Sequence, residues 1–161
     1  MIKKIFFIFT ISMILTTNVF SAGSSDSSST KTSYDKAVSY INEAKKYEKK
    51  DKAKKSKKKY EKALKLLVKS NLEIPNKADT LNYLGFTTRK LGDFVNGEKY
   101  YLEGLAIDPK HKGINEYLGE LYVFTNRIDL AKERLNVLKD CNCEEYIELK
   151  DIIEGNTKSK Y

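Results

Sequence analysis

The chain has 161 residues, 40% of them hydrophobic and 32% charged, which is typical of a soluble globular protein. Its 8 Gly and 2 Pro are too few for a collagen-like chain or for an all-β fold with many tight turns. One His and two Cys are too few for a self-contained zinc finger with four such ligands. The formal net charge is +8 at pH 7, and much of it lies in one lysine-rich segment.

Residues 1–21 have the three-part pattern of a secretory signal peptide. Lys3 and Lys4 precede an apolar run that is short for a membrane-spanning helix, and cleavage is expected after Ser21 or Ala22. An uncleaved N-terminal anchor is the alternative. Residues 22–33 are rich in Ser and are expected to form a disordered linker. The lysine-rich, Trp-free sequence looks bacterial, so export would place the protein in the periplasm.

The rest of the chain shows a period of 34 residues. Similar residues stand 34 positions apart at four places: Leu84-Gly85 and Leu118-Gly119, Gly97 and Ala131, Tyr101 and Leu135, and Pro75 and Pro109. The period and the residue types resemble the tetratricopeptide repeat, a helix–turn–helix unit. The resemblance covers residues 34–155 and implies an all-α solenoid of about three repeats plus a C-terminal capping helix.

One of the three copies is degenerate. Two regular copies are expected at 78–111 and 112–141, and the degenerate copy at 34–77. Its residues precede their counterparts by 41 positions: Tyr40 and Leu81, Ala44 and Gly85, Tyr60 and Tyr101, and Ala63 and Gly104. Because the seven extra residues make about two helical turns, the second helix of this copy is expected to be longer and to keep its buried face.

Small and turn-forming residues recur at fixed places in the copies. Gly92 and Asn126 stand fifteen positions into the two regular copies, and Asp51 precedes Gly92 by the same 41 positions; the turn between paired helices there needs a residue that tolerates positive φ. Gly85 and Gly119 are expected where paired helices approach closely. These positions agree with the helical-hairpin interpretation.

The segment after the third copy predicts a capping helix over residues 143–155. Glu144 and Glu145 place negative charge at its start, and Gly155 can end it. A solenoid needs such a helix to cover its last apolar face. Residues 156–161 are expected to form a polar tail.

The resemblance implies a concave groove that receives peptides and is lined by the first helix of each copy. The residues at the family's groove positions are Val38, Ile41, Lys45 and Glu48 in the first copy, Asp79, Asn82, Phe86 and Arg89 in the second, and Gly113, Glu116, Glu120 and Val123 in the third. Glu116 and Glu120 are expected to face Arg89 and Asn82, which suits a polar, basic peptide. Phe86 is expected to be exposed for a ligand or packed in the core. The residues that clamp a terminal carboxylate in other such repeats are missing.

The segment Lys45–Lys65 carries twelve Lys and three acidic residues. Its densest part is a basic patch formed by Lys54, Lys55, Lys57, Lys58 and Lys59. Such a patch attracts anionic lipid, polymer or acidic proteins, and the alternative is an ordinary solvated helix face. We do not expect nucleic acid as a partner of an exported protein, and no aromatic residues suited to base stacking alternate with these lysines.

The sequence offers little for catalysis. His111, between two lysines, is expected to be a solvated loop residue, and no phosphate-binding loop or nucleophile motif is present. Cys141 and Cys143 form either a disulfide or a pair of packing thiols, and a redox role is a further alternative. We expect no cofactor, no metal and no small-molecule substrate.

These features predict a non-catalytic protein–protein interaction module, a periplasmic adaptor or assembly factor that binds a peptide segment in its groove. Two alternatives stay open. The first is an envelope-surface binder that uses the Lys45–Lys65 segment, and the second is a thiol-redox protein that uses Cys141 and Cys143.

Overall fold

A computed structural model of the chain describes residues 31–157. The predicted signal peptide, the linker up to residue 30 and residues 158–161 of the predicted tail lie outside the described residues. Within 31–157 the chain forms seven α-helices and no strand: α1 (Ser33–Glu48), α2 (Ala53–Glu73), α3 (Ala78–Lys90), α4 (Phe94–Ile107), α5 (Lys112–Phe124), α6 (Ile128–Leu138) and α7 (Glu144–Ile153).

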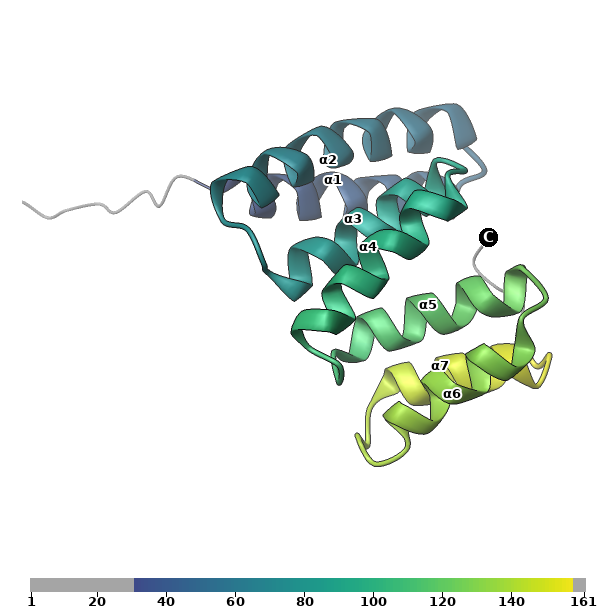
Figure 1. Cartoon of the computed structure of the whole chain (residues 1–161). Helices are drawn as coiled ribbons and strands as arrows, with labels where there is room; N and C mark the ends of the chain where they lie inside the picture. Colours follow the sequence, from purple (N-terminus) through teal and green to yellow (C-terminus); the bar gives the residue numbers. More distant parts are fainter. Residues whose placement is uncertain (1–30, 158–161) are drawn as a thin grey trace, which may run out of the picture.

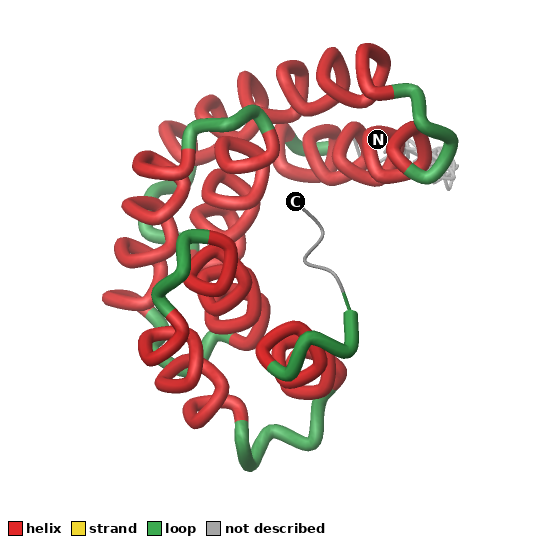
Figure 2. The backbone as a smooth tube through the Cα atoms, turned by 90° about the vertical axis from the view of Figure 1, so that its right-hand side faces the viewer, coloured by secondary structure: helices red, strands yellow, loops and turns green. Residues whose placement is uncertain are grey.

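The helices form three hairpins, α1–α2, α3–α4 and α5–α6, which stack in chain order, with α7 against the third (Figure 1). The stack is curved, with α1, α3 and α5 on the inner side of the arc and α2, α4 and α6 on the outer side (Figure 2). This architecture confirms the predicted all-α solenoid of helical hairpins with a terminal helix. No helix in residues 31–157 combines the length and apolar character that crossing a membrane requires.

The first helix begins inside the predicted linker, because Thr32 caps it. The Thr32 side chain accepts a hydrogen bond from the Asp35 N–H at 3.1 Å, and the Asp35 carboxylate accepts one from the Thr32 N–H at 3.0 Å. This reciprocal pair is a capping box, which satisfies two backbone donors at the helix start. The folded domain therefore includes the last residues of the segment 22–33.

The second helix, α2, is longer than the equivalent helix α4 of the next hairpin by the predicted seven residues. α2 has 21 residues and α4 has 14. Leu67 and Ser70, in the last third of α2, are buried. Leu72, next to the last residue of the helix, is 80% exposed. The lengthened helix therefore extends beyond the part of α2 that packs in the core.

The turns between paired helices contain the predicted residues. Asp51, Gly92 and Asn126 have φ values of 53°, 95° and 59°. Each lies between the two helices of one hairpin, so the three turns share one backbone conformation. Gly155, with φ 75°, follows α7 as predicted.

Glycines allow close helix contacts. A Cβ added to Gly85 would lie 2.5 Å from Cε1 of Tyr101, whose ring comes from the paired helix α4. At Gly119 the close neighbour is Leu149 of α7, not a residue of the paired helix α6 as predicted. The terminal helix therefore packs closely against Gly119 of α5, and it covers the end of the stack.

Aromatic and ionic contacts join the hairpins. Tyr34 and Tyr83 make a tilted ring contact between the first and second hairpins, with ring centroids 5.9 Å apart. Between the second and third hairpins, Arg127 forms a bidentate pair with Glu98, with N···O distances of 2.9 and 2.7 Å. The first contact joins two inner helices, and the second joins α4 to the start of α6 on the outer side.

Candidate functional site

The inner side of the arc carries the twelve predicted groove positions, but half of these residues are buried. Asn82, Phe86, Arg89, Glu116 and Glu120 are at most 7% exposed, which corrects the expectation of an open polar groove. The helix register placed these residues correctly on the inner helices. It does not reveal how closely the neighbouring elements cover them.

Phe86 is a core residue. Its ring centroid lies 5.0 Å from that of Tyr117 on α5 and 5.9 Å from that of Tyr60 on α2. The Lys45 ammonium lies 4.7 Å from the Phe86 ring centroid, within cation–π range. Of the two interpretations that the sequence left open, core packing is therefore correct.

Arg89 is at the centre of a buried polar network. Its Nη1 donates to the Tyr117 carbonyl at 2.6 Å, and its Nη2 donates to the Glu120 carboxylate at 3.2 Å. Burial lowers the pKa of Arg89, while neighbouring Tyr101 and Glu120 oppose this shift. Glu120 thus faces Arg89 as predicted, but the pair lies inside the protein.

Three carboxylates gather beside this guanidinium. Oxygens of Glu116, Glu120 and Glu148 all lie within 4.8 Å of one another, two on α5 and one on α7. We call these three residues the carboxylate cluster. Sequence reasoning missed Glu148, because α7 stands outside the repeat. It also missed Tyr117, although Tyr83 and Tyr117 are 34 residues apart and the period could have revealed them.

The other six predicted groove residues keep accessible surface: Val38, Lys45, Glu48, Asp79, Gly113 and Val123. Lys45 and Val123 are half-buried and Asp79 is exposed. The Asp79 carboxylate lies 3.1 Å from Nε2 of His111, and Nδ1 of His111 accepts from the Ile114 N–H at 3.1 Å. His111 is therefore the N-cap of α5 and not a solvated loop residue. Nδ1 thus caps α5, and Nε2 connects this end of α5 to α3 through Asp79.

The basic patch lies on α2, and four of its five members are exposed: Lys54, Lys55, Lys57 and Lys58. Lys59 is half-buried and forms an ion pair with Glu43 on α1, which raises the pKa of Lys59. Its ammonium also lies 4.9 Å from the Tyr40 ring centroid. The patch is thus mainly a solvated face, with one member committed to the hairpin.

Cys141 and Cys143 are joined by a disulfide in the loop between α6 and α7, with Cα atoms 5.2 Å apart. Asn142 between them has φ 48°. Both cysteines are half-buried. The disulfide connects the third hairpin to the terminal helix, and a redox role for it stays a prediction.

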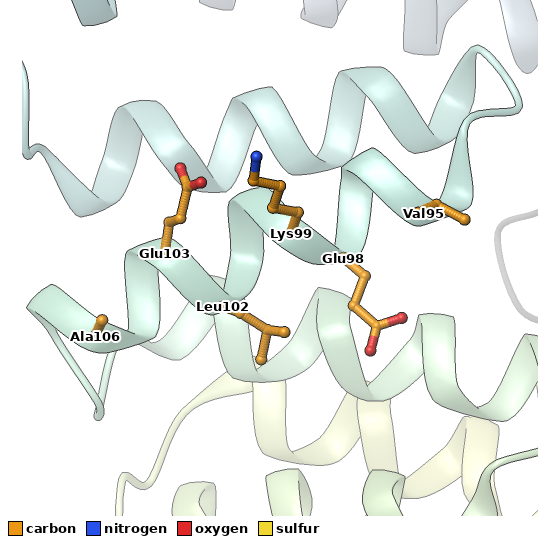
Figure 3. A pocket seen from close by; sticks show the side chains of 6 residues that line it. All are labelled: Val95, Glu98, Lys99, Leu102, Glu103 and Ala106. Carbon is orange, nitrogen blue, oxygen red and sulfur yellow. The ribbon is translucent and has the colours of Figure 1, made fainter.

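Two surface hollows lie away from most of the predicted groove. One, of about 540 Å³, is lined by six residues of α4 alone, and Glu98 at its edge points toward α6 (Figure 3). The other, of about 570 Å³, lies among the start of α1, the end of α2 and the start of α3. Of the predicted groove residues, only Asp79 lines either hollow.

Two solved structures share this architecture. The first TPR of Spaghetti (RPAP3) bound to HSP90 peptide SRMEEVD has a TM-score of 0.53 and 19% identity, and the match covers 76% of this chain and 94% of that chain. The NMR structure of the first TPR domain of the human RPAP3 protein has a TM-score of 0.54 and 18% identity, covering 78% and 98%. The fold is that of a tetratricopeptide-repeat domain.

No family model and no curated protein matches the sequence. The likeness to tetratricopeptide-repeat domains is therefore one of fold. The inner-face residues described above have to be interpreted from their own contacts in this chain.

Proposed function

We propose that this chain is a non-catalytic protein–protein interaction module that binds a peptide segment on the inner side of the arc. We further propose that it is exported to a bacterial periplasm and acts there as an adaptor or assembly factor. The pattern of residues 1–21 supports export. Fractionation of the source cells, with detection of the chain in the periplasmic fraction, tests the location.

The observation that carries the binding proposal is the curved stack with three helices on its inner side (Figure 2). A domain of the same fold was solved with an HSP90 peptide bound. In this chain the buried network of Arg89, Phe86 and Tyr117 makes the inner wall rigid. A rigid wall reduces the conformational entropy lost when a flexible segment binds.

The accessible inner-face residues define the chemistry of the partner. Lys45 offers a cation, Asp79 an anion and Val123 an apolar contact. Such a surface suits a short segment of mixed polarity. A three-repeat arc is short, so the affinity for an isolated segment is expected to be modest, with a Kd on the order of micromolar or weaker.

The test is selection of binders from a phage-displayed peptide library. Selected peptides are expected to bind the wild type and to bind Lys45→Gln/Val123→Ser more weakly, with unchanged helical circular dichroism. Val95→Ser on the outer face of α4, where Val95 is 79% exposed, is the matched control. Peptides that bind all three proteins equally would show that the inner face is not the binding site.

The envelope-surface function is a second candidate, favoured by one observation. On α2 the exposed lysines of the basic patch are followed by exposed Val68 and Leu72. A helix that exposes both lysines and apolar side chains suits the surface of an anionic bilayer. Co-sedimentation with phosphatidylglycerol vesicles, and not with phosphatidylcholine vesicles, tests it. Binding should fall steeply with added salt and in Lys54→Gln/Lys58→Gln.

A further inference from the structure

One of the two surface hollows lies where the first two hairpins meet, at the edge of the stack where α1 begins and α2 ends (Figure 1). The start of α3 completes its wall. We call it the junction hollow. Its volume of about 570 Å³ is within the range of small-molecule sites in proteins. Such a volume can hold a ligand of several heavy atoms.

We propose that the junction hollow binds the phosphate group of a small organic phosphate ester. Three observations support the proposal: the uncapped start of α3, two buried hydroxyl groups that line the hollow, and an excess of lysine charge around it. The inference goes beyond the proposed peptide binding and does not depend on it.

Helix α3 begins at the hollow with open backbone donors. Its N-cap residue Lys77 makes no side-chain capping hydrogen bond, whereas Thr32 caps α1 and Asp93 caps α4. The first backbone hydrogen bond of α3 runs from the Leu81 N–H to the Lys77 carbonyl at 3.1 Å. The N–H groups of residues 78–80 therefore have no acceptor within the helix. These donors and the positive end of the helix dipole suit an anion.

Two buried hydroxyl groups are an independent sign of a ligand. Thr80 is 3% exposed and Ser70 is 7% exposed, and they line the hollow from different hairpins. Neither hydroxyl makes a hydrogen bond with another residue in the described part of the chain. A buried hydroxyl without a partner is destabilising, so this pair favours a polar occupant. Burial also raises the pKa of Tyr34, which lines the same hollow, so its hydroxyl stays protonated and can donate.

Lysines outnumber carboxylates around the hollow. Its charged lining residues are Lys31, Lys36, Lys69, Lys77, Glu73 and Asp79, which leaves a net charge of +2. Both carboxylates face a cationic or ring nitrogen: Glu73 lies 3.6 Å from Nζ of Lys69, and Asp79 lies 3.1 Å from Nε2 of His111. A phosphate monoester carries a charge of about −1.5 to −2 at pH 7, which this lining can balance.

The nearest carboxylate outside the lining is used by the cap of α1. Asp35 accepts hydrogen bonds from the Thr32 N–H at 3.0 Å and from the Thr32 hydroxyl at 2.7 Å. Lys31 is within electrostatic reach of Asp35 and helps to lower the pKa of that carboxyl group. Lys36 and Lys77 are therefore the lysines that we assign to the ligand.

A phosphate ester fits the donors better than a carboxylate does. The donors come from three helices: Lys36 on α1, Ser70 on α2, and Thr80 with the N–H groups at the start of α3. A phosphate monoester offers three acceptor oxygens in a tetrahedral arrangement, whereas a carboxylate has two oxygens in one plane. A phosphate group alone fills only part of the hollow. Tyr34 and Ile74 offer apolar surface to the organic part of an ester.

The test is a titration of the full isotope-labelled chain with phenyl phosphate, followed in amide NMR spectra and repeated with chloride at equal ionic strength. We expect saturable shifts of the amides of residues 78–80 with phenyl phosphate only. Thr80→Val should weaken the binding about tenfold, because it removes a hydrogen bond to a charged group. If Thr80→Val lowers the helical circular dichroism, Ser70→Ala takes its place.

Two control variants separate the site from general effects. Thr87→Val removes another buried hydroxyl of α3 that has no hydrogen-bond partner among the described residues, and Thr87 does not line the hollow. It should bind phenyl phosphate as the wild type does. Lys36→Gln/Lys77→Gln should weaken the binding, whereas Lys54→Gln/Lys58→Gln, which removes the same charge from the basic patch, should not.

Two further probes distinguish the sources of such an ester. Glycerol phosphate represents a soluble molecule, and phosphatidylcholine vesicles that contain phosphatidic acid represent a lipid headgroup. With either probe, the binding has to weaken in Thr80→Val and persist in Lys54→Gln/Lys58→Gln.

The proposal is overturned if none of the three probes shifts the amides of residues 78–80, or if chloride shifts them equally. Equal affinities of Thr80→Val and the wild type would also overturn it. A chain that binds phenyl phosphate at this site but selects no peptide would keep the phosphate site and lose the proposed function.

Discussion

Replacing Arg89 with Met should destabilise the protein strongly. Arg89 is 1% exposed and its partner Glu120 is fully buried. Met retains much of the apolar contact of the arginine stem but removes the charge that faces Glu120. A buried carboxylate left without its cation destabilises a protein by about 3–5 kcal/mol. The total stability of a domain is about 5–15 kcal/mol, so the loss should be large.

Urea unfolding followed by helical circular dichroism measures this loss. In thermal unfolding, the midpoint temperature should fall by roughly 10 °C, because a loss of about 1 kcal/mol in the free energy of unfolding corresponds to a few degrees for a domain of this size. Arg127→Met is the matched control. Its side chain is 36% exposed in its pair with Glu98, so it should lose only about 0–1 kcal/mol.

A double-mutant cycle tests the reasoning. Glu120→Gln removes the buried negative charge, so Arg89→Met/Glu120→Gln should be less destabilised than the sum of the single changes, with a coupling of about 1–3 kcal/mol. Additive losses, within about 0.5 kcal/mol, would refute the claim that the two side chains form one unit. An equal loss in Arg127→Met would show that burial is not the cause.

Three further changes test other parts of the fold. Leu149→Ala should lower the free energy of unfolding by about 2–5 kcal/mol, because it leaves a cavity against Gly119, and an unchanged urea midpoint would contradict this. Gly92→Ala should lower the free energy of unfolding by about 1–2 kcal/mol through the φ of 95° alone, because an added Cβ would meet no neighbour. Gly92→Asn should lower the free energy of unfolding by less, and equal losses in the two variants would argue against a backbone cause. Hydrogen bonds from the Thr32 side chain and backbone lower the pKa of Asp35 below its ordinary 3.8. The stability difference between wild type and Asp35→Asn should therefore be full above pH 3.8 and shrink as the pH falls through the lowered value, and a difference that grows on acidification would oppose the assignment.

The repeat in the sequence was sufficient to predict the hairpins. The period of 34 residues placed Gly85 against the second helix of its hairpin, and the residues Asp51, Gly92 and Asn126 marked three turns that the structure confirms. These features are local, because each depends on a few residues of one repeat. Local patterns of this kind are visible in a single sequence.

The inner face could not be predicted in the same way. A helix register shows which side of α3 faces inward, but the burial of Phe86 depends on Tyr60 and Tyr117, which belong to other hairpins. Glu148 comes from a helix with no repeat counterpart, so no spacing connected it to Glu116. The role of His111 as a helix cap depends on the conformation of the loop before α5. The two lysines beside His111 in the sequence give no sign of that conformation.

The seven additional residues of α2 show which insertions a helical repeat can accept. At about 100° per residue, seven residues fall only about 20° short of two full turns, so the apolar stripe of α2 stays in line. An insertion of five would rotate everything beyond it by about 140° and turn that stripe toward water. The length of α2 thus lets one wall of the arc grow by about 10 Å without altering how the hairpins stack.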